Sequence, residues 1–78
     1  MLQIKYEILE HLGVLSESGG GWQKEVNIIS WNGRPAKLDI REWSPEHNRM
    51  SKGVTLTADE LRALIEIAER SGIIETEY

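Results

Sequence analysis

The sequence predicts an α+β domain in which four β-strands are followed by one C-terminal helix, and three observations support this fold class. The Asn32-Gly33 pair lies between two stretches of β-type alternation, which is the strongest local signal of a β-hairpin. Residues 3–16 also alternate between apolar and polar side chains. Residues 58–71 instead carry apolar side chains at helical spacing, directly after a helix-capping sequence.

The first expected strand covers residues 3–16. Its apolar alternate positions are Ile4, Tyr6, Ile8, Leu12 and Val14, and its polar positions include Lys5, Glu7 and His11. We therefore expect one buried face, with His11 on the opposite face. Leu9 and Leu15 break the alternation, which indicates either a β-bulge or a second buried surface, and Gly13 suits a bulge.

The second and third expected strands cover residues 22–31 and 36–43, on either side of the Asn32-Gly33 turn. A glycine-rich connection, residues 16–21, precedes them. Alternation places Val26, Ile28, Leu38 and Ile40 on one face, which we expect to be buried. The other face, expected to be open, carries Gln23, Glu25, Asn27, Ile29, Trp31, Lys37, Asp39, Arg41 and Trp43.

The C-terminal part predicts a loop, a short strand and the helix. The loop opens at Ser44-Pro45, the fourth strand covers residues 53–56, and Thr57 with Glu60 forms a capping box for the helix over residues 58–71. Gly72 ends this helix. Apolar residues off the main helical stripe, Ile67, Ile73 and Ile74, have little to cover them, which favours a homodimer contact.

The chain has 78 residues, a net charge of −4 and no cysteine. We expect one domain over residues 1–78, without disulfides or thiolate metal sites. No signal peptide or membrane span is visible, so a cytoplasmic, nucleoid-associated protein is expected. The charge is uneven, because residues 20–56 carry six Lys and Arg against four Asp and Glu, although the whole chain is acidic.

No catalytic or metal-binding arrangement assembles in the sequence. The two histidines, His11 and His47, lie far apart and have no neighbouring nucleophile with a base. The glycine run at residues 19–21 is not followed by the Gly-Lys-Ser/Thr of a phosphate-binding loop. We therefore expect a protein that is not an enzyme and that has no cofactor or metal.

The open face pairs aromatic rings with cations. Trp31 and Trp43 share it with Lys37 and Arg41, and because bases stack on aromatic rings while cations neutralise phosphates, single-stranded nucleic acid is the predicted ligand. The alternative is a solvated face on which Arg stacks on Trp. Asp39 either holds Arg41 in place or hydrogen-bonds a base edge.

Two further features stay open. Trp22 packs into the core or faces the ligand, since its alternation matches Val26 and Ile28. The loop with Arg49, Met50 and Lys52 either folds over a bound strand or is an ordinary polar loop. A different class of function is a protein-interaction module whose exposed Trp face docks a partner protein.

Several segments resemble the positive cofactor four family of transcriptional coactivators. They are Leu38–Trp43, Pro45-Glu46 and Met50–Thr57, followed by the helix. A closer likeness, to the small bacterial YdbC-like proteins, involves residues 21–25, 30–32 and 43–47. The likeness covers residues 4–70.

This resemblance implies a curved antiparallel sheet, a homodimer whose helices meet, and single-stranded DNA bound along the sheets without strong sequence preference. The family's aromatic positions match Trp31 and Trp43, and its strand-three arginine and the lysine before its last strand match Arg41 and Lys52. The full set of expected nucleic-acid-binding residues is Trp22, Lys24, Trp31, Asn32, Arg34, Lys37, Arg41, Trp43, Arg49 and Lys52. RNA is a second candidate ligand, and transcription, replication and repair are the candidate processes.

Overall fold

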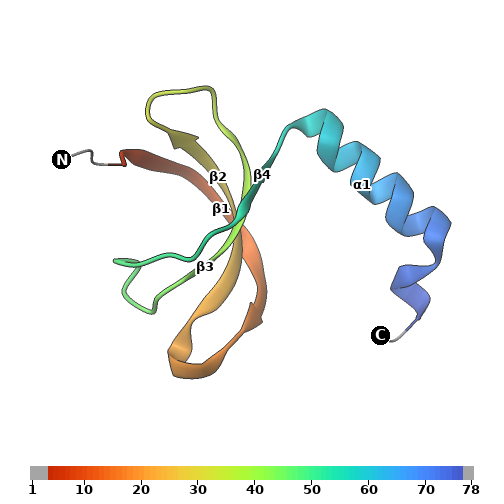
Figure 1. Cartoon of the computed structure of the whole chain (residues 1–78), viewed down its shortest axis with the longest axis horizontal. Coiled ribbons are helices and arrows are strands. Elements are labelled where there is room, and N and C mark those ends of the chain that lie inside the picture. Colours follow the sequence, from red (N-terminus) through yellow and green to blue (C-terminus); the bar gives the residue numbers. More distant parts are fainter. Residues whose placement is uncertain (1–3, 77–78) are drawn as a thin grey trace.

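The computed structural model describes residues 4–76 as one curved sheet with a helix projecting from it (Figure 1). The strands are β1 (Tyr6–Glu17), β2 (Gln23–Trp31), β3 (Lys37–Trp43) and β4 (Val54–Leu56), the helix is α1 (Ala58–Ser71), and short 3-10 turns cover η1 (Gly19–Gly21) and η2 (Ile73–Glu75). The strands pair antiparallel in chain order. The predicted fold class is confirmed, and residue 3, the expected start of the first strand, lies outside the described residues.

Strand β1 contains three bulges. Its pairing with β2 skips Leu9, Leu12 and Leu15, so each of these is an extra residue in β1. An extra residue bends a strand and increases its twist, which accounts for the long curve of β1 in Figure 1. The predicted irregularity at Leu9 and Leu15 is confirmed as bulges, and a third register shift lies between His11 and Gly13, next to the glycine expected to suit a bulge.

The bulges change which residues of β1 share a face. Directly paired residues of neighbouring strands lie on the same face of a sheet. Tyr6 pairs with Trp31, and His11 pairs with Asn27, so both β1 side chains lie on the face that carries Trp31. The expectation that His11 lies opposite Tyr6 is wrong, because the bulge at Leu9 reverses the alternation between them.

The concave face of the sheet is the buried one. We define it by Gln23, Glu25, Asn27, Ile29 and Trp31 of β2 with Lys37, Asp39, Arg41 and Trp43 of β3, the same set that alternation groups together. Its central side chains, Glu25, Asn27, Ile29, Asp39 and Trp43, are at most 4% exposed. The expectation that this face is open is wrong for these residues, because the sheet curls over them.

The aliphatic face that was expected to form the core is convex and only half-buried, as at Val26, Ile28, Leu38 and Ile40. Val54 on β4 is 55% exposed. In Figure 1 helix α1 projects away from the end of β4 instead of covering this face. Within residues 4–76, the convex face therefore stays partly open to solvent.

Helix α1 begins where the capping box predicts. Thr57 Oγ1 accepts a hydrogen bond from the Glu60 backbone N–H at 3.1 Å, and Glu60 Oε1 accepts one from the Thr57 N–H at 2.8 Å. Gly72 ends the helix at a φ of 72°. No residue of α1 is buried, and among residues 4–76 no helix is long and apolar enough to cross a membrane.

Candidate nucleic-acid interface

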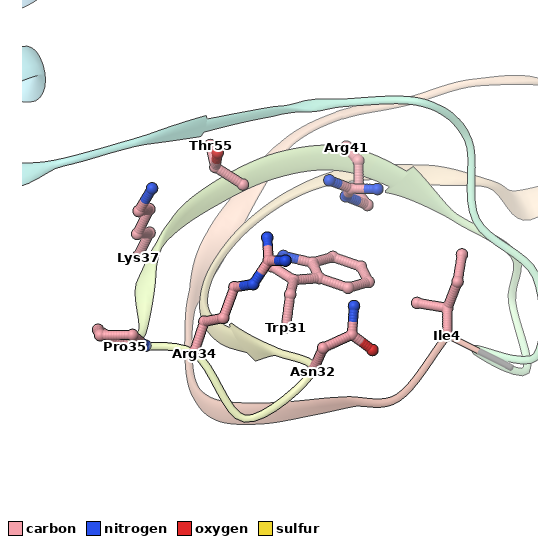
Figure 2. Close-up of a pocket in the computed structure, with 8 residues that line it drawn as sticks. All are labelled: Ile4, Trp31, Asn32, Arg34, Pro35, Lys37, Arg41 and Thr55. Atoms are coloured by element: carbon pink, nitrogen blue, oxygen red, sulfur yellow. The ribbon is translucent and has the colours of Figure 1, made fainter. Parts of the chain in front are cut away.

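A cavity of about 650 Å³ opens at the hairpin end of the concave face, and we call it the hairpin cavity. Figure 2 shows its lining residues: Ile4, Trp31, Asn32, Arg34, Pro35, Lys37, Arg41 and Thr55. Three of them are cationic and none is acidic. The Trp31 indole lies at the centre of this view, with the Arg34 guanidinium beside it. The cavity therefore combines an aromatic ring with positive charge.

The Asn32-Gly33 turn shapes this cavity. Both residues have positive φ, 52° and 74°, as the hairpin signal predicts, and the Arg34 N–H donates to the Trp31 carbonyl at 2.9 Å. Pairing between β2 and β3 nevertheless begins only at Ile29 and Lys37. The connection is thus wider than a two-residue hairpin loop, and it spreads Trp31, Arg34 and Lys37 around the opening.

Asp39 holds Trp31 and Arg41 together. Its carboxylate is fully buried and accepts two hydrogen bonds from Arg41, Nε to Oδ1 at 2.6 Å and Nη2 to Oδ2 at 2.7 Å. Trp31 Nε1 also donates to Oδ2 at 3.2 Å. Of the two roles left open for Asp39, the structure supports holding Arg41, because the buried carboxylate already has these partners and cannot reach a base edge.

Arg41 is also tied to the loop before β4. Its Nη1 donates to the Ser51 carbonyl at 3.4 Å and contacts Met50 Sδ at 3.8 Å, and its side chain is 13% exposed. The guanidinium carbon lies 4.5 Å from the Trp31 ring centroid, a cation–π contact. Because Asp39 balances its charge, the exposed cations of the hairpin cavity are Arg34 and Lys37.

A row of aromatic rings runs along the concave face, and we call it the aromatic row. Tyr6 lies between the two indoles, with ring centroids 5.4 Å from Trp31 and 5.5 Å from Trp43. The His47 imidazole then stacks on Trp43 at 4.5 Å with an angle of 7° between the planes. Trp43 is fully buried, so the expectation that it offers an open ring is wrong in this conformation.

A second, smaller cavity of about 330 Å³ lies at the other end of the concave face, around Glu25. The Glu25 carboxylate accepts from His47 Nε2 at 2.9 and 3.1 Å and from Asn27 Nδ2 at 3.2 Å. His11 Nδ1 lies 2.7 Å from Asn27 Oδ1 and 3.6 Å from Glu25. The buried carboxylate makes this end unfavourable for phosphate, in contrast to the hairpin cavity.

Five of the expected binding residues line neither cavity: Trp22, Lys24, Trp43, Arg49 and Lys52. Lys24 pairs with Glu42 on the convex face, so the structure does not bring it to the aromatic row. Trp22 is half-buried, and the guanidinium carbon of Arg49 lies 5.7 Å from its ring centroid. Lys52 is exposed in the loop before β4. Trp31, Asn32, Arg34, Lys37 and Arg41 are brought together around the hairpin cavity.

The expected site did not include Tyr6, Ile4, Thr55 or His47. Tyr6 pairs directly with Trp31, and aligning the alternation of β1 with that of β2 would have identified it, because no bulge separates Tyr6 from Ile8. Ile4 and Thr55 reach the hairpin cavity from other parts of the chain. The position of His47 follows from the fold of its loop, for which the sequence contains no periodic signal.

Comparison with known proteins places this architecture in a family. Residues 18–67, which include β2, β3, β4 and most of α1, match the family described as Transcriptional Coactivator p15 (PC4). A protein of Treponema pallidum (strain Nichols), named "Uncharacterized protein", is 58% identical over 59 residues, which are 76% of this chain and 69% of that protein. The chain therefore belongs to the PC4 family.

Proposed function

We propose that this protein binds single-stranded DNA in the hairpin cavity of its concave face, largely without regard to sequence. The observation that carries the proposal is the composition of that cavity, whose lining contains one indole ring and three cations and no carboxylate. Membership of the PC4 family supports single-stranded DNA as the ligand and transcription as the process.

Aromatic rings supply the contacts to bases in this proposal. Trp31 is half-buried and Tyr6 is 38% exposed, and their rings are neighbours in the aromatic row. A base that stacks on an aromatic side chain contributes about 1–3 kcal/mol, and every base has a face that can stack. Binding through ring faces therefore discriminates little between sequences.

Cations supply the contacts to phosphates. Arg34 and Lys37 are exposed at the cavity opening, whereas Arg41 is neutralised by Asp39. Phosphate binding releases counterions from the nucleic acid, so affinity falls as salt rises. The buried Glu25 carboxylate at the far end disfavours phosphate there, so we place the phosphates near the hairpin and the bases along the aromatic row. RNA fits the same contacts, since none of them depends on the sugar.

A second copy of the chain is part of the proposal. Leu64, Ile65 and Ile67 of α1 are 47–51% exposed, and η2 adds Ile73 and Ile74 at 49% and 70%. Apolar surface of this extent on a projecting helix favours burial against another subunit. The half-buried convex face is a further surface that a second copy would cover.

The direct test is an anisotropy titration of a labelled oligo-dT of about twenty nucleotides, longer than one ordinary single-strand site. We expect binding at low salt, progressive loss as salt rises, and weaker binding of a duplex of equal length, whose paired bases cannot stack on the row. Titration of oligo-U compares RNA. Absence of oligo-dT binding at low salt would refute the proposal.

The alternative of a protein-docking Trp face has less support from this structure. Trp43 is buried and Trp22 is half-buried under Arg49, so the open indole surface reduces to part of Trp31. Salt response separates the two functions, because an apolar protein contact is far less salt-sensitive than a phosphate contact.

A further inference from the structure

We propose that His47 closes a second base-stacking position on Trp43, and that a nucleobase of the bound strand opens it by displacing the imidazole. The inference rests on the proposed function and adds to it a gate between the free and bound forms. Single-stranded nucleic acid supplies the ligand, a planar base with ring nitrogens and carbonyl oxygens.

The geometry of the His47 ring is that of a stacked base. Its centroid lies 4.5 Å from the Trp43 ring at 7° from parallel, whereas Tyr6 meets Trp43 at a tilt of 52°. A planar nitrogen heterocycle parallel to an indole is the arrangement that a nucleobase adopts on an aromatic platform. Among residues 4–76, the imidazole is the ring that covers Trp43 in parallel.

The turn that carries His47 can release its side chain without unfolding. Ser44 closes the turn, since its N–H donates to the Arg49 carbonyl at 3.0 Å and its Oγ accepts from the Arg49 N–H at 3.0 Å. These bonds do not involve the imidazole, whose side chain is 40% exposed. His47 also has a φ of 60°, a conformation that non-glycine residues adopt uncommonly and that often occurs in switch regions.

Glu25 holds the His47 imidazole in the closed position. Its carboxylate bonds His47 Nε2 at 2.9 and 3.1 Å and is itself only 5% exposed. When the imidazole leaves, Asn27 Nδ2 remains at 3.2 Å and His11 Nδ1 at 3.6 Å. The carboxylate therefore keeps polar partners in the open form, and opening does not leave a buried charge without a hydrogen bond.

The closed form leaves one buried hydrogen-bond donor without an acceptor. Trp43 Nε1 is buried and has no hydrogen-bond partner among the described residues. A buried donor without a partner is rare in native structures and calls for an explanation. We propose that the rearrangement on opening gives this N–H an acceptor, either solvent or a bound nucleotide.

The gate extends the aromatic row beyond the hairpin cavity. Trp31 and Tyr6 bind the first bases with the gate closed, and Trp43 adds a further stacking position once His47 has moved. A base can stack on Trp43 only in the fraction of molecules whose position is open. The affinity of the native protein is therefore lower than that of a permanently open form by this fraction.

The first experiment compares oligo-dT affinity in His47→Gly with that of the native chain. Glycine adopts positive φ freely and removes the imidazole, so we expect affinity to rise, on the order of tenfold if about one molecule in ten is open in the native protein. The matched control is Pro45→Gly, which adds a glycine to the same turn, removes no side-chain hydrogen bond or charge, and keeps the His47 imidazole. Equal or weaker binding by a folded His47→Gly would overturn the gate, and so would an equal gain in the control.

The second experiment uses the native chain and does not depend on a variant. Because His47 is stacked on the Trp43 indole, we expect its ring-proton NMR signals to be shifted from those of a free imidazole, and saturation with oligo-dT should return them towards the free positions. Binding with the His47 signals unmoved overturns the gate while the proposed function stands. Absence of binding overturns both.

Discussion

Asp39 and Arg41, two residues apart on β3, form an ion pair through two N–O contacts of 2.6 and 2.7 Å. The Asp39 side chain is fully buried, and the Arg41 side chain is 13% exposed. Asp39 Oδ2 accepts hydrogen bonds from both Arg41 Nη2 and the Trp31 indole N–H. Arg41 is therefore a positioning residue that fixes the indole and the loop before β4, and phosphate contacts fall to Arg34 and Lys37.

We expect Asp39→Ala to lower the free energy of unfolding by about 3–5 kcal/mol, because it leaves the Arg41 guanidinium buried without its counter-charge. Urea denaturation at fixed protein concentration measures this. The control is Glu66→Ala, which removes an exposed ion pair with Arg70 and should cost about 0.3–0.5 kcal/mol. Equal losses in the two variants would show that the buried pair has no special role.

Replacement of the ring in the hairpin cavity tests base stacking. Trp31→Ala should weaken oligo-dT binding by about 1–3 kcal/mol, the usual loss of one stacked base. Trp22→Ala removes a ring that lies outside the cavity and should bind almost as well as the native chain. An anisotropy titration of both variants measures the difference, and an equal loss for Trp22→Ala would contradict the assignment.

Salt dependence tests the phosphate contacts. Arg34→Ala and Lys37→Ala should each reduce the slope of log affinity against log salt by about 0.7, one counterion contribution on a single strand. Lys24→Ala is matched in charge but lies on the convex face, and its slope should equal that of the native chain. A change of slope only in the Lys24 variant would place the phosphates on the convex face instead.

The oligomeric state tests the role of α1. The native chain should sediment as a dimer at tens of micromolar, and Ile65→Glu should shift it towards monomer, because a charge replaces an apolar side chain that is 50% exposed on the helix. Glu69→Gln on the same helix should leave the dimer intact. A native chain that sediments as a monomer would rule out the second copy.

The sequence predicts well which residues of β2 and β3 share a face. The period of two is a property of each strand alone, and the regular pairing from Gln23 with Trp43 to Ile29 with Lys37 preserves it. The capping box at Thr57 and the positive φ at Asn32 are equally local, and both are confirmed.

Burial could not be predicted in the same way. Alternation shows that the two faces of the sheet differ, but it does not show which face curves inward. The curvature comes from the extra residues Leu9, Leu12 and Leu15, whose effect depends on pairing with β2. The bulge at Leu9 also brings His11 to the concave face. A polar face containing Glu25 and Asp39 is buried as a consequence, with each carboxylate supplied with partners.

The covering of Trp43 is the largest departure from the expected site. Its position on the concave face is as alternation predicts, but the loop from Ser44 to Arg49 folds back and lays His47 on its ring. Loop conformation depends on hydrogen bonds such as those of Ser44, which leave no periodic pattern in the sequence.

The central claim, that the concave face at the hairpin end binds single-stranded DNA, is tested most directly by mapping NMR chemical-shift changes on addition of oligo-dT. We predict that the Trp31 indole N–H and the backbone signals of Arg34 and Lys37 shift most. The backbone signals of Lys24 and of α1 should change little. Shifts confined to the convex face or to α1 would contradict the account.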